Sequence, residues 1–363
     1  MVNREVLALR ILFVSAAVGG RGGIERVTTL VTDELESRGH HVRVLLFGPS
    51  RHPRWEEHLV DRHVGPQNLH RHLLCRWLDI VRWSRHRIRE FGPDVVIGMT
   101  PSALVVSRMV RTITRLSYPI WSWLHEALSQ LDHPWAIGYA DAHLAISSGV
   151  GNDIAKRIGR TENIHVVYNP IVNAHLQSRP ALHEQVHFVY IGRLDNSVKR
   201  IEDIFRSLAL VRQPWLLSIV GDGEDGQLLR NLAEDLNIAS RVRWLGWSSE
   251  PWDVVGPVSA LVLASISEGF GVVLAEALVR GVPIIASACA HGPRDIVQPN
   301  LNGWLFPPRN ISALHEILLR IVNNPQELPE AITVAATGAR FHLANVVDRM
   351  LEALGTSFSG RDI

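Results

Sequence analysis

The sequence predicts an α/β protein made of two doubly wound domains in tandem. The chain has 363 residues, a length at which one hydrophobic core has usually stopped growing and a second domain is expected. Short apolar runs alternate with amphipathic stretches, as in parallel strands joined by helical crossovers. The alternation stops after about 170 residues and then restarts. We therefore expect domains over 1–170 and 187–340, a linker over 171–186, and a C-terminal helix over 341–363 that packs back on the first domain.

The first domain is expected to hold six buried strands. The opening run LRILFVSA is short, carries Arg10 and leads into a glycine-rich loop, so it indicates a strand and not a signal peptide. A helical pattern follows in ERVTTLVTDELESRG and ends at Gly39. The predicted strands are the opening run at 9–16 and the runs at 41–48, 94–99, 119–125, 142–147 and 163–169.

The second domain repeats this architecture without repeating the sequence. The stretch before it, PIVNAHLQSRPALHEQV, has two prolines and mixed polarity, which is why it is expected to be a linker. Ligands of doubly wound sheets bind at the carboxyl ends of the strands, and two such domains facing each other would form a cleft. The predicted strands are 186–192, 215–223, 241–246, 259–265 and 282–287.

Composition excludes several classes of protein. A net charge of +1 gives no general argument for binding nucleic acid. Cys75 and Cys289 are the only cysteines and lie far apart, which suits a reducing, cytoplasmic compartment and argues against a disulfide framework or a zinc ribbon. The eighteen histidines show no HExxH or other zinc spacing, so we expect no protein-bound metal. No run reaches the roughly 18 apolar residues of a membrane span.

A glycine-rich loop, AAVGGRGGIER, follows the first strand and opens a helix. Glycines at such a position let the backbone approach an anion at a helix N-terminus. The spacing is not the G-x-G-x-x-G of a dinucleotide site, and the second strand ends without the acidic residue that would hold a ribose. A tight strand-to-helix turn and a close approach to a phosphate or sugar, in the loop that holds Gly19, Gly20, Gly22 and Gly23, both remain as interpretations.

Two cations follow the strand at 186–192. Arg193 comes at its carboxyl end, and Lys199, one of only two lysines in the chain, comes six residues later. An arginine can fork onto two oxygens and a lysine acts as a compact point charge, so the pair would suit a diphosphate. The alternative is a solvated basic turn.

Two glutamates, Glu268 and Glu276, are eight residues apart in SEGFGVVLAEA. Gly269 and Gly271 indicate a turn, after which Glu276 lies in a helix; eight helical residues rise about 12 Å, which disfavours a glycosidase carboxylate pair. We expect the two carboxylates to contact different parts of one elongated ligand, beside an anion site at the helix N-terminus. Two ordinary surface charges are the alternative.

His125 ends the apolar stretch WSWLHE of the first domain. Its place after a strand would let it face the cleft. A histidine beside two tryptophans is equally consistent with a satisfied core residue.

A basic segment lies at 51–92, with nine arginines and six histidines against five acidic residues. Within it, residues 74–91 form an amphipathic helical pattern whose remaining surface is crowded with Arg82, Arg85, Arg87 and Arg89. Such a helix can lie on an anionic membrane, although an ordinary packed helix with a solvated basic face fits as well. The apolar stripe is Leu74, Trp77, Leu78, Val81, Ile88 and Phe91.

Five stretches, GGIERV, GRL…K, GDGE, SEGFGVVLAEA and NGWLF, occur in this order over nearly the whole chain. In them the chain resembles glycosyltransferase family GT4, whose members are retaining enzymes of the GT-B fold, with two Rossmann-like domains facing across a cleft. The E-x7-E motif is the most specific element. Within the family the chain is similar to bacterial lipopolysaccharide 1,6-galactosyltransferases, through YADAHLAISSGV, VVYNP, RVRWLGWSSEPWDVV and GPRDIVQPNLNG.

The resemblance implies a role for each matching residue. Arg193 and Lys199 would grip the donor diphosphate, and Glu276 would bind the nucleotide ribose. Glu268 would face the transferred sugar, and His125 would meet that sugar from the first domain. The backbones of Gly269, Phe270 and Gly271 would lie beside the sugar, and Gly22 and Gly23 near the phosphates.

The resemblance thus implies a metal-independent transfer of a hexose, with galactose as a guess, from a nucleotide sugar, expected to be a UDP-sugar, to a glycan or glycolipid acceptor. An epimerase or phosphorylase on the same architecture, or a non-catalytic nucleotide-sugar-binding protein, are the alternatives. Two positions depart from the family pattern. Arg200 stands where a glycine is common, and His291 begins HGPRD in place of Gly-Gly-x-x-Glu.

Overall fold

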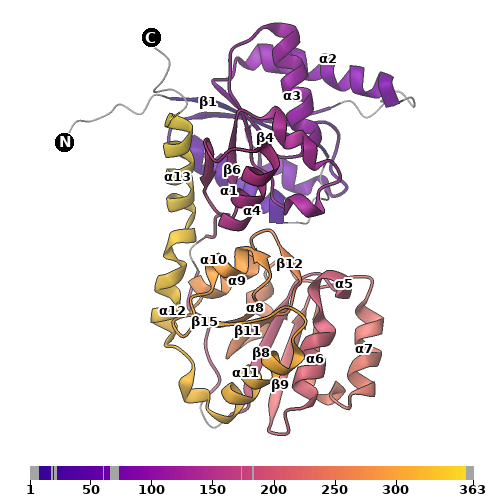
Figure 1. Cartoon of the computed structure of the whole chain (residues 1–363), viewed down its shortest axis with the longest axis vertical. Helices are drawn as coiled ribbons and strands as arrows, with labels where there is room; N and C mark the ends of the chain where they lie inside the picture. The colour runs from indigo at the N-terminus through magenta and orange to yellow at the C-terminus, as the bar shows by residue number, and fades with distance from the viewer. Residues whose placement is uncertain are drawn as a thin grey trace, which may run out of the picture. The chain divides into compact units, whose positions relative to one another are not determined.

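The structure, a computed structural model, describes residues 8–17, 19, 23–59, 61–65, 73–172, 174–181 and 184–356. They form two compact units, one of Met1–Pro170 with Leu343–Ile363 and one of Ile171–His342. Each unit is a parallel sheet with helices on both of its faces (Figure 1).

The first unit has a seven-stranded sheet in the order β3-β2-β1-β4-β5-β6-β7, with every neighbouring pair parallel. The strand order reverses between β1 and β4, which makes this the switch point of a doubly wound sheet. Its strands are β1 Arg10–Ser15, β2 His41–Leu46, β3 Arg62–Val64, β4 Val95–Gly98, β5 Ile120–Ser122, β6 Ala142–Ala145 and β7 Ile164–Val166. Its helices are α1 Gly23–Ser37, α2 Leu73–Phe91, α3 Pro101–Thr114, α4 Ser148–Ile158 and α13 Leu343–Thr356, with short 3-10 turns at Pro53–His58, Leu128–Gln130 and Pro134–Tyr139.

The second unit has a six-stranded parallel sheet in the order β10-β9-β8-β11-β13-β15, with its switch point between β8 and β11. The strands are β8 Val186–Ile191, β9 Trp215–Val220, β10 Val242–Gly246, β11 Ala260–Leu263, β13 Ile284–Ser287 and β15 Gly303–Phe306. A separate two-stranded ladder pairs β12 Ser267–Glu268 with β14 Ala290–His291. The helices are α5 Asn196–Lys199, α6 Ile201–Ala209, α7 Gly226–Asp235, α8 Pro251–Val255, α9 Val272–Val279, α10 Gly292–Ile296, α11 Ile311–Asn323 and α12 Ala331–Gly338, with 3-10 turns at Ala239–Arg241, Pro325–Glu327 and Ala339–Phe341.

The central strands of both sheets are mostly apolar, since helices cover both faces, although His187 of β8 and Ser218 of β9 are buried polar residues. Every residue of β4, β8, β9 and β11 is buried. The predicted α/β class with two doubly wound domains is confirmed. Sequence reasoning missed three strands: β3, which carries Arg62 and His63, and the short β12 and β14. It also left NGWLF as a motif, although β15 forms there.

The segment that follows Pro170 is held by the second unit. Ile171 forms a bridge with His342, and its N–H donates to the Phe341 carbonyl at 2.7 Å. Gln177, further along, donates its backbone N–H to the Arg280 carbonyl at 2.8 Å. The stretch expected to act as a linker therefore also packs on the unit that it enters.

The last helix, α13, belongs to the first unit, where it packs against α1. Arg38, the residue after α1, lies 2.5 Å from Asp348, and Arg349 donates to the Val167 carbonyl at 3.2 Å. The helix begins at Leu343, and residues 357–363, which the predicted helix included, lie outside the described residues.

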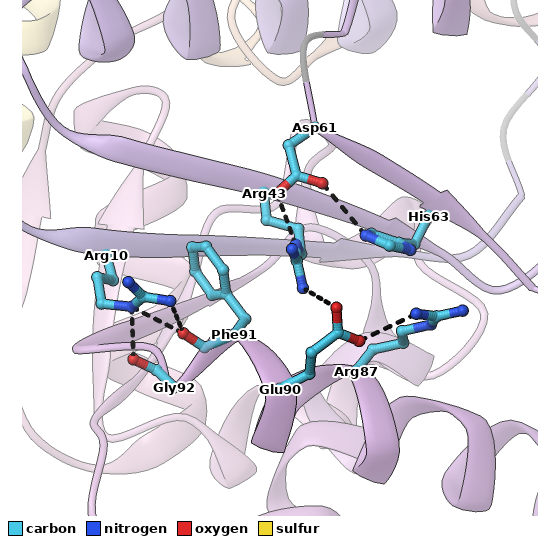
Figure 2. A network of polar contacts seen from close by, with 8 residues as sticks. All are labelled: Arg10, Arg43, Asp61, His63, Arg87, Glu90, Phe91 and Gly92. Atoms are coloured by element: carbon cyan, nitrogen blue, oxygen red, sulfur yellow. Dashed lines mark hydrogen bonds and ion pairs between the residues drawn. The ribbon is translucent and has the colours of Figure 1, made fainter.

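The C-terminal end of α2 is tied to the sheet by arginines of two strands (Figure 2). Arg10 donates to the carbonyls of Phe91 and Gly92, and the guanidinium groups of Arg10 and Arg43 each lie 4.8 Å from the centre of the Phe91 ring. Arg43 also lies 3.6 Å from Glu90, which accepts from Arg87 at 3.0 Å. Figure 2 shows these contacts, in which Arg43 of β2 meets Glu90 of α2, and Glu90 in turn meets Arg87.

Only part of the predicted apolar stripe of α2 is buried. Val81, Ile88 and Phe91 are buried in the unit, whereas Leu78 is 59% exposed. The side chain of Leu74 lies outside the described part of the structure. Most of the stripe thus serves the core, and the surface left to solvent carries Arg82, Arg85 and Arg89.

Candidate functional site

The candidate site of the second unit lies where its strand order reverses. β8 is followed by Arg193 and then by α5, which ends at Lys199. β11 is followed by Ser265 and by β12, which carries Glu268. Carboxyl ends of parallel strands on either side of a switch point flank the crevice in which such sheets bind ligands.

Lys199 and Glu268 meet directly at this edge. The Lys199 Nζ lies 2.6 Å from Glu268 Oε1, and the Ser265 hydroxyl donates to the same oxygen at 2.6 Å. A backbone bond from the Ile266 N–H to the Val198 carbonyl, 2.9 Å long, joins the two loops. The lysine side chain is 23% and the glutamate 11% exposed, so both remain accessible to a ligand. The ion pair offsets the charge of the lysine.

The turn that presents Lys199 is built from local capping bonds. Asp195 caps α5 by accepting from the Val198 N–H at 3.4 Å, and the Ser197 hydroxyl bond to this carboxylate is the main cause that holds its pKa below the usual range. Arg200 then adopts the left-handed conformation, with φ of 52°. The residue that departs from the family glycine thus keeps a glycine-like backbone, and its ion pairs with Glu202 and Asp203 offset the strain.

Arg193 is exposed beside this turn, and a hydrogen bond from a buried side chain holds its backbone. The buried Tyr190 hydroxyl donates to the Arg193 carbonyl at 2.7 Å. Burial, with the nearby Glu268 carboxylate adding to it, raises the pKa of Tyr190 well above its ordinary value, so the phenol keeps its proton and remains a donor.

The turn after Glu268 is crowded against the next loop. Gly271 has φ of +88° and precedes α9, which begins at Val272 as predicted. Glu268 pairs with His291 in the two-stranded ladder, and His291 has φ of 79°, again a glycine-like conformation at a non-glycine residue. A Cβ on Gly292 would lie 1.8 Å from the Phe270 carbonyl oxygen. The backbones of the two loops are therefore in direct contact beside the carboxylate.

Glu276 lies inside α9, where the sequence predicted it, and has different partners from Glu268. The indole N–H of Trp252 donates to Glu276 Oε2 at 3.2 Å. The two carboxylates are thus held separately, one by a lysine and a serine and the other by a tryptophan.

A buried thiol lies behind Glu268. Cys289 is 2% exposed, and burial raises the pKa of its thiol to about 11. The thiol therefore stays protonated and acts as a small packing group at neutral pH.

His125 belongs to the first unit, after β5. Its Nδ1 lies 3.1 Å from Asn169 Oδ1, and its ring centre is 4.4 Å from that of Trp123. Burial lowers the pKa of His125 to about 4, so the imidazole is neutral at physiological pH. Of the two predicted loop glycines in this unit, Gly23 begins α1, and Gly22 lies outside the described residues.

The structure brings Arg193, Lys199, Glu268 and the glycine turn to one edge of one sheet, and it leaves His125 in the other unit. Sequence reasoning missed four supporting residues, of which a hydroxyl three residues from a site residue could have flagged two, Ser265 and Tyr190. Among the described residues no cluster of three or more metal-ligating side chains occurs, and no helix there is long and apolar enough to cross a membrane. The four supporting residues that the sequence did not predict are Ser265, Tyr190, Asn169 and Trp252.

Comparison with known proteins covers both units. Residues 21–174 match the family described as Glycosyltransferase Family 4, and residues 174–338 match Glycosyl transferases group 1. A lipopolysaccharide 1,6-galactosyltransferase of Salmonella typhimurium is 33% identical over 92% of this chain and 95% of its own length.

Two solved structures share the architecture. The apo form of the lipopolysaccharide outer core galactosyltransferase WaaB has a TM-score of 0.88 with 31% identity, covering 96% of this chain and 99% of that one. Anabaena HepE, solved in complex with UDP, has a TM-score of 0.82 with 21% identity, covering 95% and 99%.

Two Rossmann-like units, with cations and carboxylates gathered at the switch point of the second, define a glycosyltransferase of the GT-B fold. The chain belongs to glycosyltransferase family 4, as its relatives of more than 30% identity over nearly their whole length establish.

Proposed function

We propose that this chain transfers galactose from a UDP-sugar to a lipopolysaccharide-core or similar cell-envelope glycan, with retention of configuration and without a bound metal. The observation that carries the proposal is the Lys199–Glu268 contact at the switch point, which sets a cation beside a carboxylate at the ligand edge. The name of the Salmonella relative supports the sugar and the acceptor, and the UDP complex of HepE supports the nucleotide.

In this mechanism the cations replace a metal. The bond between the sugar C1 and the diphosphate oxygen breaks, and negative charge builds on the leaving nucleoside diphosphate. Arg193 and Lys199 stabilise that charge, while Glu268, released from the lysine, orients the sugar. The acceptor oxygen forms the new bond to C1 on the same face, and its proton passes to the leaving phosphate.

A release assay over a panel of nucleotide sugars tests the donor and the class of reaction together. We expect selective release of UDP from UDP-galactose, dependent on an acceptor glycan and unaffected by a chelator. An epimerase would return an isomeric sugar nucleotide without releasing UDP, and a phosphorylase would require free phosphate. The anomeric configuration of the product, read by NMR, would contradict retention if it were inverted.

Glu276→Ala is expected to raise the donor KM more than it lowers kcat. If Glu276 binds the ribose, the contact is present both before and during transfer, so its removal weakens binding uniformly. Steady-state kinetics with varied donor and saturating acceptor measure both constants. A fall in kcat at constant KM would move Glu276 to the reacting sugar.

We further propose that the enzyme works at the cytoplasmic face of the membrane, touching anionic lipid through residues 74–91. The part of α2 that supports this is the exposed row Arg82, Arg85 and Arg89 with Leu78, since Val81, Ile88 and Phe91 are buried in the unit. Attraction of this kind depends on the charge of the surface and weakens with salt.

Flotation with liposomes measures this contact. The protein is expected to float with vesicles containing anionic lipid at low salt and to stay unbound with neutral vesicles. Replacing the three arginines with glutamate should abolish binding, whereas Arg157→Glu with Arg160→Glu, two exposed arginines at the end of α4, should not. Equal loss in both variants would point to nonspecific attraction by net charge.

A further inference from the structure

Trp252 and Glu276 form a contact between two helices of the second unit. Trp252 is buried in α8, and its indole N–H donates to the carboxylate of Glu276 in α9 at 3.2 Å. Hydrogen bonds to a charged acceptor are stronger than neutral ones, and a tryptophan ring has few torsions to lose. The carboxylate is thereby held by a rigid donor rather than by a flexible side chain.

Arg280 secures the indole from the end of the helix that carries Glu276. It is the C-cap residue of α9, and its guanidinium carbon lies 5.2 Å from the centre of the Trp252 ring. Its NH1 donates to the Glu276 backbone carbonyl at 3.2 Å. The arginine covers the ring face by a cation–π contact while the ring edge donates to the carboxylate. Glu276 therefore accepts a hydrogen bond from the edge of the indole, and Arg280 packs on its face.

Gln177 joins the two helices at their ends. Its side-chain amide donates to the Gly256 carbonyl, after α8, at 2.6 Å, and its backbone N–H donates to the Arg280 carbonyl at 2.8 Å. Gln177 belongs to the segment by which the chain enters this unit. The spacing of α8 and α9, and with it the contact of Trp252 with Glu276, is fixed by this third element.

From these contacts we infer that Trp252 is a positioning residue, which sets the rotamer of Glu276 for the nucleotide ribose of the donor. This inference rests on the proposed function for the identity of the ligand. Trp252 touches no ligand in this account; it acts through Glu276. Removing its N–H takes one donor from the carboxylate and loosens its rotamer, which weakens donor binding before and during transfer alike.

A matched pair of substitutions tests this role. Trp252→Phe keeps a ring and removes the N–H. Trp215→Phe is the control, because Trp215 is also buried, donates its N–H to the Val211 carbonyl at 3.2 Å and lies under Arg241 at 5.2 Å. We expect Trp252→Phe to raise the KM for UDP-galactose about tenfold with kcat unchanged, the cost of about one charged hydrogen bond. Trp215→Phe should change neither constant.

A double-mutant cycle separates positioning from general destabilisation. In the Glu276→Ala background, Trp252→Phe is expected to add less than about twofold to KM, since its effect passes through the missing carboxylate. An additive effect, or equal effects of the two tryptophan substitutions, would overturn the inference. Thermal melting of each variant identifies any loss of folding.

A readout without donor distinguishes this inference from the proposed function. In protein labelled with ¹⁵N-tryptophan, Glu276→Gln should shift the indole N–H resonance of Trp252 and leave that of Trp215 in place. If this shift occurs but wild-type protein uses no UDP-sugar, the proposed donor is wrong and the positioning of Glu276 stands. An unshifted Trp252 resonance would refute the positioning whatever the donor.

Discussion

Lys199→Ala is expected to lower kcat by about 10²–10³-fold, equivalent to roughly 2.7–4 kcal/mol of transition-state stabilisation, by analogy with the removal of one oxyanion donor. Lys199 supplies a cation at the point where the proposed reaction builds negative charge. The substitution also removes the partner that lies 2.6 Å from Glu268 Oε1, so that the carboxylate keeps the Ser265 hydroxyl alone. Both changes act on the same step.

Two further variants serve as comparisons for Lys199→Ala. Lys199→Arg retains the charge but changes its shape and reach, and an intermediate loss of kcat is expected. Lys156→Ala removes the other lysine of the chain, which is exposed on α4, and should leave kcat unchanged. Wild-type turnover by Lys199→Ala, measured as UDP release at saturating donor, would remove Lys199 from the site.

Gly292→Ala is expected to destabilise the protein by roughly 3 kcal/mol and to reduce activity at least 10²-fold. The added Cβ would lie 1.8 Å from the Phe270 carbonyl oxygen and 2.4 Å from its Cα, and neither atom belongs to a side chain that can rotate away. One of the two loops must move. Because Glu268 pairs with His291 in the adjoining ladder, the movement displaces the carboxylate as well.

Urea unfolding and donor kinetics measure the two effects. Gly355→Ala is the control, since Gly355 is exposed in α13 with nothing within 4 Å of an added Cβ. Alanine has a higher helix propensity than glycine, so this substitution should be neutral or stabilise by up to about 1 kcal/mol. Normal stability and activity in Gly292→Ala would show that the loop contact is easily rearranged.

The architecture could be predicted because it depends on local patterns. Strands such as β4 and β11 are continuous apolar runs, and the amphipathic stretches between strands form the helices that cover the sheets. The position of Arg193 and Lys199 after the end of a strand could also be predicted, because the apolar run that precedes them is visible in the sequence. Glu276 was correctly expected in a helix because a glycine turn precedes it by a few residues.

The supporting contacts could not be predicted, since they join residues remote in sequence. Trp252 and Glu276 are 24 residues apart, and His125 and Asn169 are 44 apart. Nothing in a tryptophan or an asparagine alone indicates which carboxylate or imidazole it will meet. Arg200 and His291 show the converse case, in which the substituted residue keeps the left-handed backbone because the surrounding contacts fix it.

The return of α13 to the first unit bears on the order in which the chain can fold. The second unit is a continuous stretch, Ile171–His342, inserted between two pieces of the first. During synthesis it is complete before Leu343 leaves the ribosome, whereas the face of α1 that receives α13 must wait for the last helix. The first unit is therefore finished after the second, and a fragment ending at Pro170 would lack the helix that covers α1.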